Sequence, residues 1–242
     1  MKTGIFYGIG VGPGDPQLIT MKGVRVLNNC KHVFVPKART ASDSVALSIA
    51  GIYLGSQVKV YELVFPMTSN STELKERWDD SAEQVAKVLE TGEDACFLTL
   101  GDPLLYSTYI YLLRSLRERI KDIEAVTIPG ITAFSAAAAL TDFAVGTAKE
   151  QVTIVPTADD MTAVKEALHR GGTIVLMKIG KRLHDILEII EENGLISRSV
   201  FVSRAGMPDQ RIETDLRILR NACPEEGYLS IILIHASKEI TE

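Results

Sequence analysis

Short apolar runs rich in β-branched residues alternate with longer amphipathic segments along almost the whole chain of 242 residues. The apolar runs predict strands at residues 5–9, 32–35, 58–61, 95–100, 125–128, 152–155, 173–177, 200–203 and 229–234. The amphipathic segments predict helices at residues 16–29, 73–90, 106–117, 131–140, 161–169 and 183–192. Repeated strand–helix alternation is typical of α/β proteins. The pattern relaxes around residues 141–150, so we predict two α/β domains, at residues 1–143 and 148–242.

Composition limits the kinds of partner. The formal net charge is −5, so no broad positive field attracts nucleic acid. The longest apolar helix candidate, residues 131–140, is too short to cross a membrane. Cys30, Cys96 and Cys223 form no Cys-x-x-Cys pair, and the four histidines are scattered, which predicts no metal site. With no secretory signal pattern at Met1, we expect a cytoplasmic protein.

A glycine-rich turn, Gly10-Val-Gly-Pro-Gly-Asp-Pro16, follows the first predicted strand. Glycines at such a place let a ligand approach the backbone closely. A dinucleotide-binding turn is excluded because its spacing requires glycine where Pro13 or Asp15 stands. A phosphate-binding Walker loop is excluded because no Gly-Lys-Ser/Thr follows. Taken alone, the turn fits a ligand site and a ligand-free tight turn about equally well.

Two further predicted strands in the first half also end in glycine turns, Gly101-Asp-Pro and Pro129-Gly-Ile-Thr-Ala133. Open α/β sheets bind ligands beyond the carboxyl ends of their strands. Asp102 offers a carboxylate to a ribose hydroxyl or an ammonium group, or it caps the next helix. Thr132 and Ala133 open a predicted helix, where backbone N–H groups meet a ligand or a cap.

In the second half, the segments Val175-Leu-Met-Lys178 and Val202-Ser-Arg-Ala-Gly-Met-Pro208 stand where predicted strands end. Taken in order with the three earlier turns, they resemble the tetrapyrrole methylase family, the class III methyltransferases that use S-adenosylmethionine. The resemblance covers essentially the whole chain. The runs of residues 101–112 and 129–135 most resemble the enzymes that methylate C20 of precorrin-2 or cobalt-factor II in cobalamin biosynthesis.

The resemblance implies two α/β domains with the active site in the trough between them, and a homodimer. The first domain would carry the tetrapyrrole-side loop and part of the S-adenosylmethionine site, which the second domain would complete, with S-adenosylhomocysteine as product. Carried over by position, the cofactor-binding residues are Val11, Gly101, Asp102, Leu105, Tyr106, Thr132, Ala133, Met177, Ala205, Ser230 and Ile231.

The same resemblance assigns substrate contacts. The loop of Pro13, Gly14 and Asp15 would face the tetrapyrrole. Substrate carboxylates call for basic side chains, and the candidates include Lys178 and Arg204, of which Arg204 is the best because it directly follows a predicted buried strand. The further candidates are Lys37, Arg39 and Lys181.

Methyl transfer to an electron-rich ring carbon requires alignment and exclusion of water rather than a protein nucleophile. A proton leaves C20 afterwards, and Tyr106 and Asp102 are the candidate catalytic groups to receive it, with water as another acceptor. The alternatives are methylation of another ring position or of another substrate, such as a diphthamide intermediate or ribosomal RNA, and a nucleoside-binding module without catalysis. The net charge of −5 disfavours RNA.

Overall fold

The computed structural model describes residues 2–37, 44–65, 71–157 and 161–237. The chain divides into two compact units, Met1–Thr132 and Ala133–Glu242. The predicted boundary at residues 143–148 is therefore wrong. It lay too late because the alanine-rich helix α5 (Ala133–Thr141) packs on strands of the second unit, which its sequence pattern alone does not reveal.

A parallel five-stranded sheet forms the first unit, with the order β3-β2-β4-β1-β5. The strands are β1 (Phe6–Gly10), β2 (His32–Lys37), β3 (Lys59–Val64), β4 (Ala95–Thr99) and β5 (Ala125–Ile128). Every residue of β4 is buried, because β4 lies inside the sheet and both of its faces are covered. This confirms the prediction of a strand buried on both faces from an uninterrupted apolar run.

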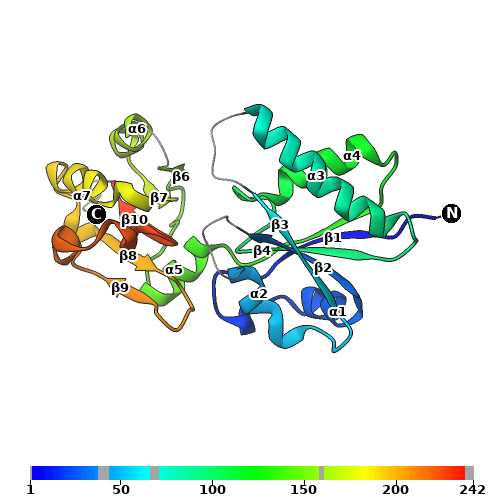
Figure 1. Cartoon of the computed structure of the whole chain (residues 1–242). Coiled ribbons are helices and arrows are strands. Elements are labelled where there is room, and N and C mark those ends of the chain that lie inside the picture. The colour runs from blue at the N-terminus through cyan, green and yellow to red at the C-terminus, as the bar shows by residue number, and fades with distance from the viewer. Residues whose placement is uncertain (1, 38–43, 66–70, 158–160, 238–242) are drawn as a thin grey trace. The chain divides into compact units, whose positions relative to one another are not determined.

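Helices cover both faces of this first sheet (Figure 1). On one face lie α1 (Met21–Asn29) and α2 (Val45–Ala50), followed by the short 3-10 helix η2 (Gly51–Tyr53). On the other face lie α3 (Ser71–Leu89) and α4 (Tyr109–Arg119), which pack against each other. Because the five strands are parallel, their carboxyl ends lie at one edge of the sheet. The helices cover the two faces and leave the loops at that edge free to form a site.

Two predicted helices of the first unit begin later than expected. The helix expected at residues 16–29 is split into the 3-10 helix η1 (Pro16–Leu18) and α1, because the Thr20 hydroxyl accepts the Gly23 N–H at 3.1 Å and starts a new helix. The helix expected from Tyr106 begins at Tyr109 instead. Tyr106 has a left-handed φ of +52° and cannot be part of that helix.

The second unit holds a mixed sheet with the order β6-β7-β10-β8-β9. Its strands are β6 (Val152–Pro156), β7 (Thr173–Met177), β8 (Ser199–Ser203), β9 (Arg211–Glu213) and β10 (Ser230–His235). The pair β6–β7 is parallel, and the pairs β7–β10, β10–β8 and β8–β9 are antiparallel. Because β10 runs against its neighbours, the start of β10 lies beside the ends of β7 and β8.

Helix α5 covers one face of the second sheet, and α6 (Thr162–Arg170) and α7 (Leu183–Glu192) cover the other (Figure 1). Four 3-10 helices complete the unit: η3 (Gly180–Arg182), η4 (Ile196–Arg198), η5 (Leu216–Asn221) and η6 (Pro224–Gly227). No helix within the described ranges is both long enough and apolar enough to span a bilayer.

A histidine at the end of β10 is expected to make the second unit sensitive to acid. The His235 ring stacks on Phe143 with centroids 3.9 Å apart, and its Nδ1 lies 3.2 Å from Thr173 Oγ1. Burial lowers the pKa of His235, an effect that Arg198 reinforces and Glu150 opposes. The unfolded chain then binds the proton more readily, so the free energy of unfolding should fall as the pH drops below about 6.5.

Urea unfolding followed by circular dichroism at several pH values measures this dependence. His235→Gln should flatten the acid limb, whereas His169→Gln, on the exposed side of α6, should leave it as in the wild type. An acid limb that persists unchanged in His235→Gln would contradict the assignment.

Candidate functional site

Three loops of the first unit meet where β1, β4 and β5 end. Strand β1 lies between the other two, with Gly10 opposite Thr99 and Ile9 opposite Ile128. Since the strands are parallel, the loops at residues 10–16, 100–107 and 129–132 leave the same edge of the sheet. The three predicted glycine turns of the first half are thus brought together, at the edge where open α/β sheets bind ligands.

The three turns pack backbone against backbone. A Cβ on Gly130 would stand 2.1 Å from the Gly101 carbonyl oxygen, and a Cβ on Gly10 would stand 2.6 Å from the same oxygen. Gly101 also exchanges two hydrogen bonds with Gly12, whose carbonyl accepts the Gly101 N–H at 2.8 Å. Close packing alone therefore requires glycine at positions 10 and 130, whether or not a ligand binds.

Gly101 differs from these two glycines. Its φ is +69°, and the nearest atom to a Cβ placed there is the Ile131 carbonyl oxygen, 4.0 Å away. The packing around this buried backbone therefore leaves room for a Cβ at Gly101, which would make one ordinary van der Waals contact. A small ligand that must lie against the main chain fits this place, which is what the family resemblance implies for S-adenosylmethionine.

The Asp102 carboxylate is held by two backbone N–H groups. Its Oδ1 accepts the Leu104 N–H at 2.8 Å, and its Oδ2 accepts the Gly130 N–H at 3.0 Å. The first bond closes a turn within the Gly-Asp-Pro loop, and the second ties that loop to the turn after β5. Asp102 thus has a clear structural partner for each oxygen, whereas a proton acceptor must present an oxygen to the substrate.

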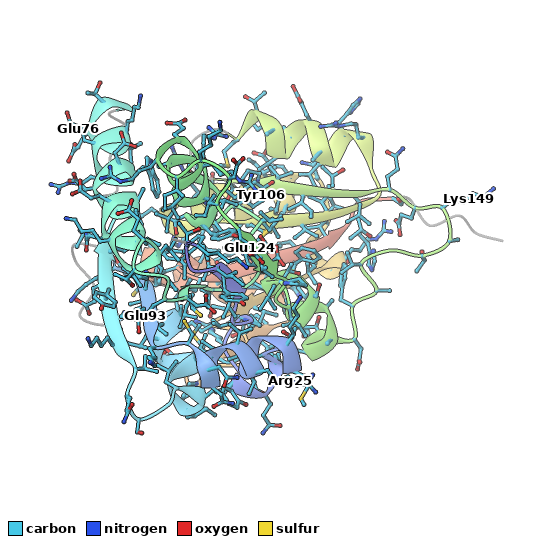
Figure 2. All side chains as sticks on the ribbon, turned by 90° about the vertical axis from the view of Figure 1, so that its right-hand side faces the viewer. Arg25, Glu76, Glu93, Tyr106, Glu124 and Lys149 are labelled. Atoms are coloured by element: carbon cyan, nitrogen blue, oxygen red, sulfur yellow. The ribbon has the colours of Figure 1, made fainter. Side chains whose placement is uncertain are left out.

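Tyr106 stands in a strained and accessible part of the same loop. Its backbone is left-handed, and 41% of the residue is exposed. Figure 2 labels this side chain. The backbone just after it is fixed by Ser107, whose hydroxyl lies 2.8 Å from Thr99 Oγ1 and accepts the Tyr109 N–H at 3.1 Å. Non-glycine residues in left-handed conformations are uncommon and gather at functional sites. The loop therefore presents Tyr106 on a firmly anchored base, while Leu105 is half-buried.

The loop after β1 is largely buried. Val11 is fully buried in the core, and its N–H donates to the Thr99 carbonyl at 3.0 Å, so its side chain has no path to a ligand and only its carbonyl remains available. Pro13 and Gly14 are also buried. Asp15 is half-buried, and its Oδ1 accepts the Gln17 N–H at 2.8 Å to cap η1. Thr132, also half-buried, is the last residue of the unit.

In the second unit, three left-handed residues gather at one edge of the sheet. Lys178 (φ +56°) follows β7, Arg204 (φ +49°) follows β8, and Leu229 (φ +53°) precedes β10. The strand register places them together, because Ile231 pairs with Met177 and Ser230 pairs with Ser203. The Arg204 N–H also donates to the Leu229 carbonyl at 2.9 Å. Such clustered strain indicates a functional edge.

Four predicted cofactor-binding residues of the second unit belong to one hydrophobic cluster on the α5 face of the sheet. They are Ala133, Met177, Ala205 and Ile231. Ser230 precedes Ile231 and so faces the other side of the sheet. Its hydroxyl donates to the Gly227 carbonyl at 2.7 Å. The structure therefore brings four of these five residues together and turns the fifth side chain away from them.

Ser203 is a feature that the sequence analysis missed. It is fully buried at the end of β8, and its hydroxyl has no hydrogen-bond partner within the described part of the chain. Buried hydroxyls rarely remain unsatisfied. The sequence signal for it is a polar residue at the end of an apolar strand.

Two of the five predicted substrate cations, Arg204 and Lys37, form ion pairs. Arg204 Nε lies 3.1 Å from Asp209, and its Nη1 lies 4.0 Å from Glu226. Lys37, at the end of β2, forms an ion pair with Glu62 at 2.7 Å. Lys178 and Lys181 have exposed side chains. Arg39 lies outside the described residues.

Among the described residues, no group of three or more His, Cys, Asp or Glu side chains is arranged to hold a metal ion.

Comparison with known proteins adds a separate line of evidence. The family model described as Tetrapyrrole (Corrin/Porphyrin) Methylases matches residues 6–219. A cobalt-precorrin-2 C(20)-methyltransferase of Salmonella typhimurium is 31% identical over 99% of this chain and 99% of its own. A probable cobalt-precorrin-2 C(20)-methyltransferase of Methanocaldococcus jannaschii is 34% identical over 81% of this chain and 83% of its own.

A solved structure shares the fold. It is the uroporphyrin-III C-methyl transferase from Thermus thermophilus, complexed with S-adenyl homocysteine. The TM-score is 0.66 at 18% sequence identity, and the match covers 96% of this chain and 97% of the other. At this identity the likeness establishes the two-domain α/β architecture and nothing finer.

Proposed function

Since the chain belongs to the tetrapyrrole methylase family, we propose that it transfers a methyl group from S-adenosylmethionine to C20 of precorrin-2 or cobalt-factor II in cobalamin biosynthesis. The observation that carries this proposal is the similarity over 99% of both chains to a C20-methyltransferase. Gly101 supports it, because a bare main chain with room beside it stands at the expected cofactor position.

We propose that residues of each unit contact the cofactor. In the first unit these are the carbonyl of Val11, the main chain of Gly101, and Leu105, Tyr106 and Thr132. In the second unit they are Ala133, Met177, Ala205 and Ile231, together with the main chain of Ser230. Ala133 and Met177 are the partly buried members of this apolar cluster, which suits an adenine ring.

S-adenosylmethionine supplies an activated methyl group on its sulfonium. The protein has to align the electron-rich C20 with that methyl group and exclude water from it. In the loop of Pro13, Gly14 and Asp15, the half-buried Asp15 is the residue that faces the tetrapyrrole, and the buried Pro13 and Gly14 support it. Lys178 and Arg204 attract the substrate carboxylates. By its position in the Gly-Asp-Pro segment, the Tyr106 hydroxyl is the candidate to receive the C20 proton.

Binding and turnover test the proposal together. The purified protein should bind S-adenosylhomocysteine in titration calorimetry and should not bind ATP. With ¹³C-methyl S-adenosylmethionine, the label should appear on C20 of the product in ¹³C NMR. Precorrin-2 and its cobalt form should be assayed side by side, because only that comparison assigns the metal state of the substrate.

Absence of S-adenosylhomocysteine binding would refute the proposal. Binding with no transfer to either substrate would favour the nucleoside-binding module. A label on another ring carbon would assign the chain to a different methylation step of the same family.

We also propose that the chain works in the cytoplasm as a homodimer, as the family resemblance implies. Cys30 and Cys96 are buried and form no disulfide, which fits a reducing compartment. Light scattering of the purified protein tests the dimer, and a monomer at micromolar concentration would contradict it.

A further inference from the structure

We infer that Asp102 is a positioning residue and not the base of the reaction. By joining the turns after β4 and β5, it fixes the opening beside Gly101, which is the space between the Gly101 main chain and the Ile131 carbonyl. This inference rests on the proposed function, since the opening is where the cofactor is expected to lie. It departs from the sequence-based expectation that the carboxylate itself binds the cofactor or receives the C20 proton.

The geometry of the carboxylate is that of a bridge. Its Oδ1 bonds within its own loop, to the N–H of Leu104 two residues on. Its Oδ2 reaches 28 residues along the chain to the N–H of Gly130. A carboxylate that accepts two backbone N–H groups makes charge-assisted hydrogen bonds, which are stronger and shorter than neutral ones. The two turns are therefore held at a definite separation.

The residues next to the bridge form the two walls of the opening. Gly101 immediately precedes Asp102, and Ile131 immediately follows Gly130. The atom nearest to the empty Cβ position of Gly101 is the Ile131 carbonyl oxygen, 4.0 Å away. Breaking the Asp102–Gly130 bond frees one wall from the other without removing any atom from the opening itself.

The backbones of Gly101 and Gly130 also lie in close contact. A Cβ on Gly130 would stand only 2.1 Å from the Gly101 carbonyl oxygen, so the two backbones are as near as glycine permits. The Gly101 N–H is already bonded to the Gly12 carbonyl. The Asp102 carboxylate supplies the acceptor for the N–H of Gly130, which is half-buried.

Asp102→Asn tests the bridge with little change in shape. Its amide oxygen can still accept the Leu104 N–H, but its NH₂ group then faces the Gly130 N–H, and two donors cannot bond. We expect amide hydrogen exchange of Gly130 to lose protection while that of Leu104 keeps it. Affinity for S-adenosylhomocysteine should fall about tenfold, which is the scale of one charge-assisted hydrogen bond.

A matched control stands at the opposite end of the same unit. The Oδ1 of Asp94, next to Glu93 (Figure 2), accepts the Ile5 N–H at 2.8 Å and so also joins two segments. Asp94→Asn should lower the unfolding midpoint about as much as Asp102→Asn does, and it should leave S-adenosylhomocysteine affinity unchanged.

Kinetics separate positioning from catalysis. Asp102→Asn should raise KM for S-adenosylmethionine while kcat stays within a few-fold of the wild type and the pH profile keeps both limbs. The affinity lost should be the same for S-adenosylhomocysteine and for 5′-methylthioadenosine, which lacks the amino-acid group, because no single ligand group meets Asp102.

Three results would overturn the inference. In Asp102→Asn, these are wild-type protection of the Gly130 amide from hydrogen exchange and wild-type affinity for S-adenosylhomocysteine. The third is a thousandfold loss of kcat in that variant, together with the loss of one limb of its activity–pH profile. If the wild-type protein itself binds no S-adenosylhomocysteine, the proposed function fails, and the exchange of the Gly130 amide still decides whether the bridge exists.

Discussion

Gly130→Ala is expected to disrupt the first unit and abolish cofactor binding. The new methyl group would stand 2.1 Å from the Gly101 carbonyl oxygen and 2.8 Å from the Gly10 backbone. Both neighbours are main chain at the ends of inner strands, so neither can move aside without breaking the sheet edge. Forced overpacking of this kind costs about 3 kcal/mol or more. Urea unfolding followed by Trp78 fluorescence measures the loss.

Trp78 is a suitable reporter because it is the single tryptophan of the chain and lies in α3 of the first unit, stacked on Phe65 and Tyr111. The control is Gly51→Ala. No atom lies within 4 Å of a Cβ at Gly51, and its backbone is right-handed helical, so the free energy of unfolding should change by less than about 0.5 kcal/mol. Equal midpoints for the two variants would show that the turns are not packed as described.

Strand positions followed well from the sequence wherever burial was complete. The run of residues 95–100 predicted β4 (Ala95–Thr99) to within one residue, because a parallel strand covered on both faces must be continuously apolar. By contrast, β9 (Arg211–Glu213) was missed. It has three half-buried residues, of which Arg211 and Glu213 form an ion pair at 2.8 Å, so no apolar run marks it.

The position of α5 shows a second limit of prediction from the sequence. Its alanine-rich sequence indicates close packing but does not identify the sheet that it covers. The contacts of α5 with β10 and β8 decide this, and they move the division of the chain to Thr132. Periodicity reports how an element buries its faces, and tertiary contacts alone report which partner buries them.

The candidate site was predictable as a set of residue types and not as a geometry. Glycine turns after strands identified Gly10, Gly101 and Gly130 as notable, but their separate roles follow from distances. A Cβ at Gly10 or Gly130 would collide with neighbouring backbone, whereas a Cβ at Gly101 would not. The bond from Asp102 to Gly130 joins residues 28 positions apart, and nothing local announces it. The left-handed backbone of Leu229 likewise has no sequence signal, since leucine is not favoured there.

Gly101→Ala is expected to cost little stability and to weaken S-adenosylhomocysteine binding at least about a hundredfold. An alanine at φ +69° costs about 1 kcal/mol, the scale for a left-handed residue that is not glycine. The fold tolerates the methyl group, since the nearest atom is 4.0 Å away. That group fills the space against which the cofactor must lie, and a loss of about 2.7 kcal/mol corresponds to a hundredfold change in Kd. Calorimetry measures the affinity.

Gly194→Ala separates the backbone effect from the steric one. Gly194 follows α7 in the second unit with φ +67°, and no atom lies within 4 Å of a Cβ there. Its substitution should therefore carry the same conformational cost as Gly101→Ala while leaving S-adenosylhomocysteine affinity at the wild-type value. If both variants bind the ligand normally, the cofactor does not lie against Gly101. If both lose affinity equally, the effect comes from the backbone and the opening beside Gly101 is not the binding place.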